Sequence, residues 1–200
     1  AGKWRKVGCV DCACVAGGEA KVWIEDRGFQ FGDGVYEVIR TYKRCPFSLD
    51  AHLARLDRSA AAISLQQPYS RADWTHHILE GIKQAAYPEA KIYLQITRGV
   101  APRDHAYSDD ATPTVVMTVR EFHPLDRSVQ ATGVDAMTTE DIRWGRCDIK
   151  SVNLLANVLA RQRGRHAGAF GAMLVHGGVV TEGAISSGLL CRGGTVVAAP

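Results

Sequence analysis

Lys150 is the residue of this sequence best suited to covalent chemistry. It lies in Cys147–Ser151 (CDIKS), between a strand-like segment and the start of an apolar helix. A lysine at such a junction is usually solvated at the surface. If it is partly buried instead, its pKa falls and the neutral amine can form a Schiff base with a carbonyl compound. The residue types alone leave both interpretations open.

Glu182 and Arg55 could bind a charged ligand. Glu182 ends an apolar strand between Thr181 and Gly183, where a carboxylate either caps a turn or points into a pocket toward a cationic partner. Arg55 lies off the apolar stripe of a predicted helix, where arginines are usually solvated. A guanidinium can also hold a phosphate with its planar fork of donors.

A polar loop, residues 98–105, brings Arg98, Arg103 and His105 close together in the chain. Two arginines and a histidine suit a small carboxylate, although a plain surface loop has the same composition. Residues 32–34 (GDG) are not a dinucleotide fingerprint, because the third glycine and the following helix are missing. The sequence contains no legible Ser-His-Asp or zinc-hydrolase arrangement.

The cysteines offer a weaker metal-binding signal. The chain has six, of which Cys9, Cys12 and Cys14 form a C-x-x-C-x-C cluster. Such a half-motif binds zinc only if a fourth ligand comes from elsewhere, and the nearest histidine in sequence is His52. We therefore expect reduced thiols near a strand and no metal site.

Composition excludes several classes of protein. With 200 residues, 46% hydrophobic and 22% charged, the chain is of ordinary globular composition and can bury a sizeable core. A net charge of +3 is too small to argue for nucleic acid or an anionic membrane as a partner. No apolar run approaches a membrane span, and Asp11 and Glu19 interrupt any signal peptide. We expect a soluble, cytoplasmic protein.

Hydrophobic periodicity predicts the elements of the first half. The pattern favours strands at 35–42, 91–97 and 114–119, a short extended piece at 45–49, and a polar loop at 98–113. One helix should begin at an Asp50 N-cap, with Leu53, Leu56, Ala60 and Ile63 on its apolar face. A second should begin after Ser70, with Trp74, Ile78 and Ile82 facing inward.

The second half should begin near residues 121–127 (EFHPLDR), where the composition shifts. Here we expect a strand at 130–138, a helix at 154–166 stopped by Gly168, and two hairpins turning at 176–178 and 193–194. Helices and strands are interleaved in both halves, so the predicted class is α/β or α+β. The predicted domains are residues 1–121 and 122–200.

Taken together, these segments resemble the class IV aminotransferases, which are fold-type IV pyridoxal-phosphate enzymes. Within that family the sequence is most similar to the D-amino-acid (D-alanine) transaminases. The similarity runs in register from about Val22 to Glu182. The matching segments are Glu25–Glu37, His52–Leu56, Thr97–Gly99, Arg103–His105, Asp141–Trp144, Cys147–Ser151 with Asn153–Leu155, and Val180–Gly183.

The resemblance implies a role for each matched residue. Lys150 would hold pyridoxal 5'-phosphate covalently and then move the substrate proton. Glu182 would pair with the pyridine nitrogen, and Arg55 would grip the cofactor phosphate. Tyr36, Arg103 and His105 would trap the substrate α-carboxylate. In the family the arginine and histidine of this trap come from the partner subunit, so a homodimer is implied.

The implied fold is a small N-terminal α/β sandwich domain followed by an α/β barrel-like domain that binds the cofactor. The implied reaction is ping-pong transamination between a D-amino acid, such as D-alanine or D-glutamate, and a 2-oxo acid. The Arg-x-His pair distinguishes this group from branched-chain transaminases and the lyase that makes aminobenzoate. Those two activities remain the alternatives within the fold.

Two departures from the family bear on activity. The run after the acidic residue is Ala184–Gly188 (AISSG), where the family usually has more serines ending in asparagine. Family members also continue for several tens of residues beyond Pro200, which would complete the second domain. We therefore expect a fragment of a transaminase or a C-terminally shortened enzyme, and an inactive remnant of the fold is a further alternative.

Overall fold

The computed structural model describes residues 7–11, 13–16 and 19–198, without the side chains of residues 7 and 13–16. The chain forms two compact units. Unit 1 comprises Ala1–His123 and Asp148–Val152, and unit 2 comprises Pro124–Cys147 and Asn153–Pro200. The sequence analysis predicted a single boundary after residue 121. It did not predict that residues 148–152 would belong to unit 1. That each unit is a separate folding domain stays a prediction.

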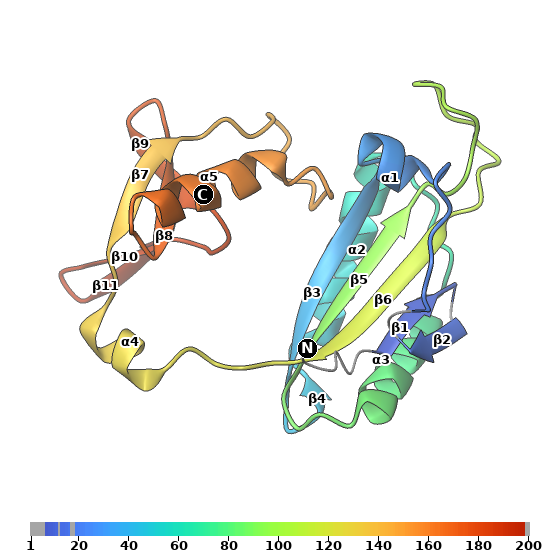
Figure 1. Ribbon diagram of the computed structural model, residues 1–200, viewed down its shortest axis with the longest axis horizontal. Coiled ribbons are helices and arrows are strands. Elements are labelled where there is room, and N and C mark those ends of the chain that lie inside the picture. The colour runs from blue at the N-terminus through green and yellow to red at the C-terminus, as the bar shows by residue number, and fades with distance from the viewer. Residues whose placement is uncertain (1–6, 12, 17–18, 199–200) are drawn as a thin grey trace. The chain divides into compact units, whose positions relative to one another are not determined.

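Unit 1 is built on an antiparallel sheet of six strands, and Figure 1 shows its central strands side by side. Their spatial order is β2-β1-β6-β5-β3-β4, so the central strands β6, β5 and β3 come from distant parts of the chain. The strands are β1 (Val7–Val10), β2 (Ala13–Ala16), β3 (Gly34–Tyr42), β4 (Cys45–Pro46), β5 (Ala90–Thr97) and β6 (Thr114–Glu121).

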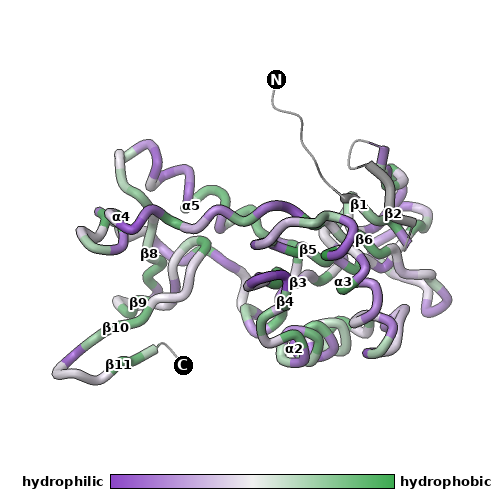
Figure 2. Tube along the Cα trace, turned by 90° about the horizontal axis from the view of Figure 1, so that it is seen from below, coloured by the Kyte–Doolittle hydropathy of each residue, from purple (hydrophilic) through white to green (hydrophobic). Residues whose placement is uncertain are grey.

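Three helices belong to this unit: α1 (Arg27–Phe31), α2 (Leu49–Ala62) and α3 (Arg71–Ala85). Helices α2 and α3 contribute to the same hydrophobic core as the sheet, because each buries one stripe against it. The predicted inward residues Leu53, Leu56 and Ala60 of α2 are buried. In Figure 2 the colour of α2 alternates between hydrophobic and hydrophilic as the helix turns.

The two faces of β3 differ in the way that strand geometry requires. Val35, Glu37, Ile39 and Thr41 are buried on one face, while Tyr36 on the other is partly exposed. In β5, Ile92, Leu94 and Ile96 are buried as their alternation predicted. Register pairs Val35 with Ile96 and Ile39 with Ile92, so the buried faces coincide.

The start of α2 differs from the sequence prediction. The N-cap is Ser48, in a left-handed conformation and without a side-chain cap hydrogen bond, and Asp50 lies in the first helical turn. In that turn the negative Asp50 carboxylate can still interact favourably with the positive end of the helix dipole. The extended piece expected at 45–49 is only the two-residue strand β4. Helix α3 begins as predicted, because Ser70 and Asp73 form a capping box.

Unit 2 contains a three-stranded mixed sheet in the order β7-β8-β9. Strands β7 and β8 are parallel and are connected through helix α5, whereas β8 and β9 form the predicted hairpin through Gly177 and Gly178. Both glycines have positive φ, as a tight hairpin turn requires. The elements are α4 (Arg127–Thr132), β7 (Ala136–Glu140), α5 (Leu155–His166), β8 (Gly171–His176), β9 (Val179–Gly183), β10 (Leu189–Arg192) and β11 (Thr195–Ala198).

The strand predicted at 130–138 is wrong in its first part. Residues Arg127–Thr132 form helix α4, whose N-cap Asp126 accepts a hydrogen bond from the Ser128 backbone N–H. Gly133, at positive φ, ends this helix, and the strand begins only at Ala136. The N-cap signal at Asp126 outweighs the strand propensity of the residues that follow it.

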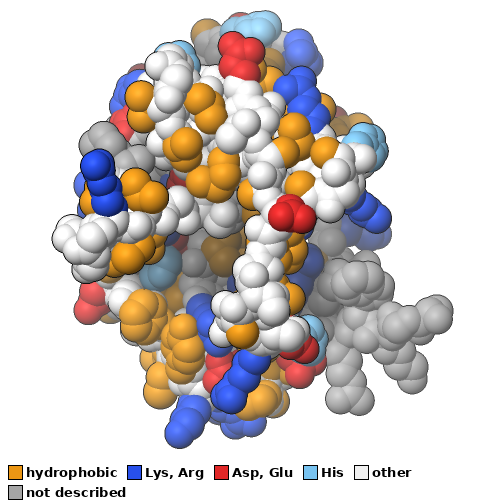
Figure 3. Space-filling view, turned by 90° about the vertical axis from the view of Figure 1, so that its left-hand side faces the viewer, with side chains coloured by type: hydrophobic (Ala, Val, Ile, Leu, Met, Phe, Trp, Pro, Cys, Tyr) orange, Lys and Arg blue, Asp and Glu red, His pale blue; other side chains and the backbone are white. Residues whose placement is uncertain are grey.

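Much of unit 2 is apolar and exposed. Its core cluster consists of Ala160, Ala172, Leu174 and Ala184. All eight residues of the β10–β11 hairpin are exposed, and Figure 3 shows hydrophobic side chains at the surface of this unit. Across the described residues, the helices are too short or too polar to span a bilayer.

The cysteines differ from the expectation of reduced thiols at one position. Cys9 is buried and disulfide-bonded. Cys12 and the side chain of Cys14 lie outside the described residues. Cys45, Cys147 and Cys191 are exposed free thiols. Within the part of the chain that the structure describes, no three His, Cys, Asp or Glu residues are grouped to hold a metal ion.

Candidate active site

The Lys150 backbone is fixed on both sides by unit 1. Its N–H donates to Ser59 Oγ of α2 (3.1 Å), and its carbonyl accepts from the Tyr36 N–H of β3 (3.0 Å). Ser151 forms a bridge with Val35, which extends this contact along β3. The segment therefore places the lysine beside β3 even though more than 100 residues separate the two in sequence.

The Lys150 side chain is half-buried, and its Nζ lies 4.4 Å from the centroid of the Tyr36 ring. No described residue forms a hydrogen bond or ion pair with this amine. The amine is therefore free of ion pairing among the described residues, and in its neutral form a lysine amine can form a Schiff base with a carbonyl compound.

Tyr93 supports the Tyr36 ring from the neighbouring strand. The two rings stack with their centroids 5.6 Å apart, and the Tyr93 hydroxyl donates to Gln95 Oε1 (2.5 Å). Burial raises the pKa of Tyr93 to about 12, so its hydroxyl stays protonated at neutral pH. Tyr93 therefore acts as a neutral platform beneath Tyr36.

Arg55 of α2 is held by the buried carboxylate of Glu37. Arg55 Nε donates to Glu37 Oε1 (2.5 Å) and Nη2 to Oε2 (2.7 Å), while His52 Nδ1 lies 2.8 Å from Oε2. The Arg55 side chain is 43% exposed, whereas that of Glu37 is fully buried. No described residue accepts a hydrogen bond from Arg55 Nη1. The fork is thus fixed by one acid and keeps a donor for a second anion.

Burial and pairing oppose each other at Glu37. Burial raises the pKa of this carboxyl, but the hydrogen bonds from Arg55 and His52 outweigh it and hold the pKa below its usual value. The hydrogen bond from Arg55 to Glu37 correspondingly raises the arginine's pKa. Both groups are therefore charged across the physiological range.

Glu182 lies on β9 in unit 2 and is paired with an arginine. Arg143 Nη1 donates to Glu182 Oε2 (2.6 Å), while Arg143 Nε and Nη2 bind Asp141 at 2.9 and 2.8 Å. The Thr181 hydroxyl also donates to Asp141 (2.7 Å). The hydrogen bond from Arg143 holds the Asp141 pKa well below its usual range, and Arg143 has a raised pKa. Glu182 Oε1 has no hydrogen-bond partner among the described residues, so it can accept from a cationic N–H.

Arg103 and His105 lie in the loop between β5 and β6, and both are exposed. The Arg103 guanidinium lies 4.9 Å from the centroid of the Phe31 ring, and the His105 ring lies 5.3 Å from it. Neither side chain forms a hydrogen bond or ion pair with a described residue. Both therefore have donors free for an anion.

The structure brings some of the predicted residues together and leaves others apart. Tyr36 contacts Lys150, and Arg103 and His105 share the Phe31 ring. Arg55 belongs to the Glu37 cluster, and Glu182 belongs to unit 2. In the described part of the chain, no hydrogen bond, ion pair or ring contact joins Arg103 or His105 to Tyr36 or Lys150.

The sequence patterns did not identify the carboxylates that bind the arginines Arg55 and Arg143. Glu37 occupies an inward position of a strand whose neighbours Val35 and Ile39 are apolar, and a carboxylate at such a position must have a partner. That signal was available in the alternation of β3. Asp141 and Arg143 carry no comparable signal, because their partners Thr181 and Glu182 are about 40 residues away.

Most of the chain matches the sequence model of a known family. Residues 34–200 match the family model for amino-transferase class IV. The chain therefore belongs to the class IV aminotransferase family.

Its curated relatives include D-alanine aminotransferases. That of Bacillus licheniformis is 46% identical over 169 residues, which cover 84% of this chain and 59% of the relative. That of Staphylococcus haemolyticus is 40% identical over 182 residues, covering 91% of this chain and 64% of the relative. The chain thus spans about six tenths of the length of these relatives.

Solved structures share the fold. The fold IV-transaminase CpuTA1 of Curtobacterium pusillum aligns with a TM-score of 0.78 and 25% identity, over 96% of this chain and 71% of that one. The branched-chain amino acid aminotransferase of Escherichia coli aligns with a TM-score of 0.87 and 21% identity, over 95% and 66%. The predicted fold-type IV α/β class is confirmed.

Proposed function

We propose that this chain is part of a transaminase that uses pyridoxal 5'-phosphate to move an amino group between a D-amino acid and a 2-oxo acid by a ping-pong mechanism. The similarity to D-alanine aminotransferases supports the reaction class. The observation that carries the proposal is Lys150, whose backbone is fixed by Ser59 and Tyr36 while its amine has no acidic partner among the residues that the structure describes.

The residues present fit this cofactor. The Lys150 amine suits its aldehyde. Within the described part of the chain, Arg55 Nη1 and Glu182 Oε1 have no hydrogen-bond partner, so they suit its phosphate and a protonated pyridine nitrogen respectively. When bound, pyridoxal phosphate supplies an electron sink for the charge left on the substrate α-carbon when its proton is removed.

The protein's own residues would divide the remaining tasks. Lys150 would hold the cofactor covalently, and its released amine would move the proton at the substrate α-carbon. Glu37 would keep Arg55 aimed at the phosphate. Arg143 would hold the Glu182 carboxylate in place with two of its hydrogen bonds anchored on Asp141.

D-amino acids such as D-alanine or D-glutamate are the proposed substrates, with Tyr36, Arg103 and His105 binding the α-carboxylate. The free donors of Arg103 and His105 support this role. A homodimer is also proposed, in which Arg103 and His105 act on the partner's substrate. The exposure of Trp23 (75%), Ile24 (69%) and Phe29 (75%) in unit 1 supports an interface between copies.

The decisive experiment is visible absorbance of the purified protein with pyridoxal phosphate, before and after adding D-alanine. We expect a band from the lysine-bound cofactor that D-alanine converts to the pyridoxamine form. Lys150→Ala should lack the band, whereas Lys91→Ala, which changes an exposed lysine of β5, should keep it.

The same experiment separates the alternatives. A band that responds to L-leucine and not to D-alanine would move the protein to the branched-chain transaminases. Release of pyruvate from aminodeoxychorismate would instead favour a lyase, a class represented among its structural neighbours by the Pseudomonas aeruginosa enzyme at 26% identity. A full band in Lys150→Ala would refute Lys150 as the anchor.

A further inference from the structure

We propose that Arg27 is a positioning residue for the substrate carboxylate. It fixes the backbone of Asp104–Ala106, so that Arg103 and His105 are held in place before the acid arrives. The inference rests on the proposed function, because it takes Arg103 and His105 as the carboxylate-binding pair.

One buried guanidinium binds three consecutive backbone carbonyls. Arg27 Nη1 donates to the Asp104 carbonyl (2.5 Å) and the Ala106 carbonyl (3.4 Å), and Nη2 donates to the His105 carbonyl (3.2 Å). The Arg27 side chain is only 4% exposed, and its Nε donates to Asp33 Oδ2 (2.9 Å). All of its donor nitrogens therefore serve the protein, and none is left for a ligand.

The loop has little else to hold it. Residues 101–113 contain no helix or strand, and Arg103, Asp104, His105 and Ala106 are all exposed. The other hydrogen bond at this point is local, from the Ala106 N–H to Asp104 Oδ1 (3.2 Å). A loop of this kind samples many conformations unless it is tied down, and binding a ligand then costs ordering entropy. Arg27 removes that cost at His105 and its neighbours.

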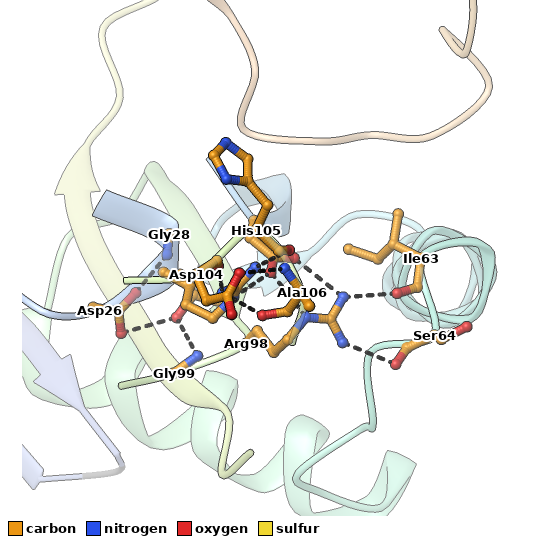
Figure 4. A network of polar contacts seen from close by, with 12 residues as sticks. Asp26, Gly28, Ile63, Ser64, Arg98, Gly99, Asp104, His105 and Ala106 are labelled. Carbon is orange, nitrogen blue, oxygen red and sulfur yellow. Dashed lines mark hydrogen bonds and ion pairs between the residues drawn. The ribbon is translucent and has the colours of Figure 1, made fainter. Parts of the chain in front are cut away.

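The Phe31 ring contacts the side chains of Arg103 and His105, whereas Arg27 binds the backbone of the loop. Its ring lies 4.8 Å from the Arg27 guanidinium, 4.9 Å from that of Arg103, and 5.3 Å from the His105 ring. Figure 4 shows the His105 ring pointing away from the polar network while its backbone faces the network. The backbone and one face of each binding side chain are thus fixed, and their donors are left free.

Arg98 provides a matched control within the same network. It is 6% exposed and binds the same carboxylate, Asp33, through Nε (2.8 Å) and Nη2 (3.1 Å). Its other side-chain hydrogen bonds among the described residues go to the carbonyls of Ile63 and Ser64 at the end of α2, and it contacts the loop through the Tyr107 ring. Arg98 therefore shares the charge and burial of Arg27 but binds no carbonyl of the loop.

The first test measures the loop without any turnover. Arg27→Lys keeps the charge beside Asp33 but cannot hold three carbonyls with a planar fork. We expect hydrogen–deuterium exchange of residues 103–106 to become about tenfold faster in Arg27→Lys and to change less than twofold in Arg98→Lys. Equal exchange in the two variants would overturn the inference.

The second test measures carboxylate binding by the full-length protein loaded with pyridoxal phosphate. In Arg27→Lys, the KM for D-alanine and the inhibition constant of propionate should both rise about tenfold, while kcat changes less than twofold. In Arg98→Lys both constants should stay near wild type. A purely structural role would lower the active fraction of both variants and leave KM unchanged, which would overturn the inference.

A second variant keeps the test decisive if Arg27→Lys does not fold. Phe31→Leu retains an apolar side chain but removes the ring, and it should also raise the inhibition constant of propionate. Wild-type protein that neither accepts D-alanine nor is inhibited by propionate would instead refute the proposed substrate, and with it this inference. That outcome is visible before any variant is made.

Discussion

Glu37 shows how a single residue couples the stability of unit 1 to the candidate phosphate site. Its carboxylate is fully buried, so it must be compensated by partners, and Arg55 and His52 supply them. The same hydrogen bonds fix the direction of the Arg55 fork. One acid therefore contributes to the free energy of unfolding and also orients the arginine that we propose binds the phosphate.

Replacing Glu37 with glutamine should weaken both properties. Glu37→Gln loses the charge-assisted hydrogen bonds to Arg55, so the free energy of unfolding should fall by about 2 kcal/mol. Affinity for pyridoxal phosphate should also fall, because the Arg55 guanidinium is no longer held in one orientation by the Glu37 carboxylate. Urea unfolding and a cofactor titration measure the two effects. Glu80→Gln, at an exposed pair with Lys83, should change each by little.

At the scale of elements, the junction between β5 and the loop that follows it depends on a glycine. Gly99 has a φ of 92°, and its carbonyl accepts from the Arg27 N–H (2.8 Å). A Cβ at this position would lie 1.8 Å from the Thr112 carbonyl oxygen. The two ends of the loop that carries Arg103 and His105 can approach this closely only because residue 99 has no side chain.

Gly99→Ala should therefore destabilise unit 1 strongly. Backbone strain and the clash with Thr112 together should cost about 3 kcal/mol or more. Gly133→Ala separates the two causes, since Gly133 has a φ of 76° but a Cβ there would meet nothing within 4 Å. That variant should cost about 1 kcal/mol in urea unfolding. Equal costs at both positions would show that the clash is relieved by a shift of the loop.

Across the whole molecule, three paired carboxylates make stability depend on acid pH. Burial raises the pKa of Asp33 and Glu37, but hydrogen bonds from Arg98 and Arg27, and from Arg55 and His52, outweigh it and hold both pKa values below normal. In unit 2, the hydrogen bonds from Arg143 lower the pKa of Asp141. Each group binds a proton more readily in the unfolded chain than in the folded one.

The direction of the pH dependence follows from these lowered values. The stabilisation is fully present above the unfolded pKa values, about 4, and is lost as pH falls through the lower folded values. Urea midpoints followed by Trp74 fluorescence, in the core of unit 1, should be flat from pH 6 to 8 and drop below about pH 4.5. An Asp33→Asn, Glu37→Gln double variant should be less stable at pH 7 and should show a shallower fall. An unchanged slope in that variant would contradict the assignment.

Local patterns in the chain predicted most of the regular elements. Four features appear as predicted: the stripe of Leu53, Leu56 and Ala60, the alternation in β5, the start of α3 after Ser70, and the Gly-Gly hairpins. These predictions are correct because each pattern depends on residues that are close together in the sequence. The prediction failed at Asp50 and at 130–132, where competing caps a few residues away took precedence.

The pairing of the charged groups, in contrast, depends on long-range contacts. Arg27 binds carbonyls 77 to 79 residues away, and Glu37 binds Arg55 from another element. Lys150 contacts β3 through the segment Asp148–Val152, which belongs to unit 1 although it follows part of unit 2 in the sequence. The sequence shows each of these residues but does not show which of them contact one another. A local pattern records whether a position faces inward, whereas the strand order and register decide which distant group meets it there.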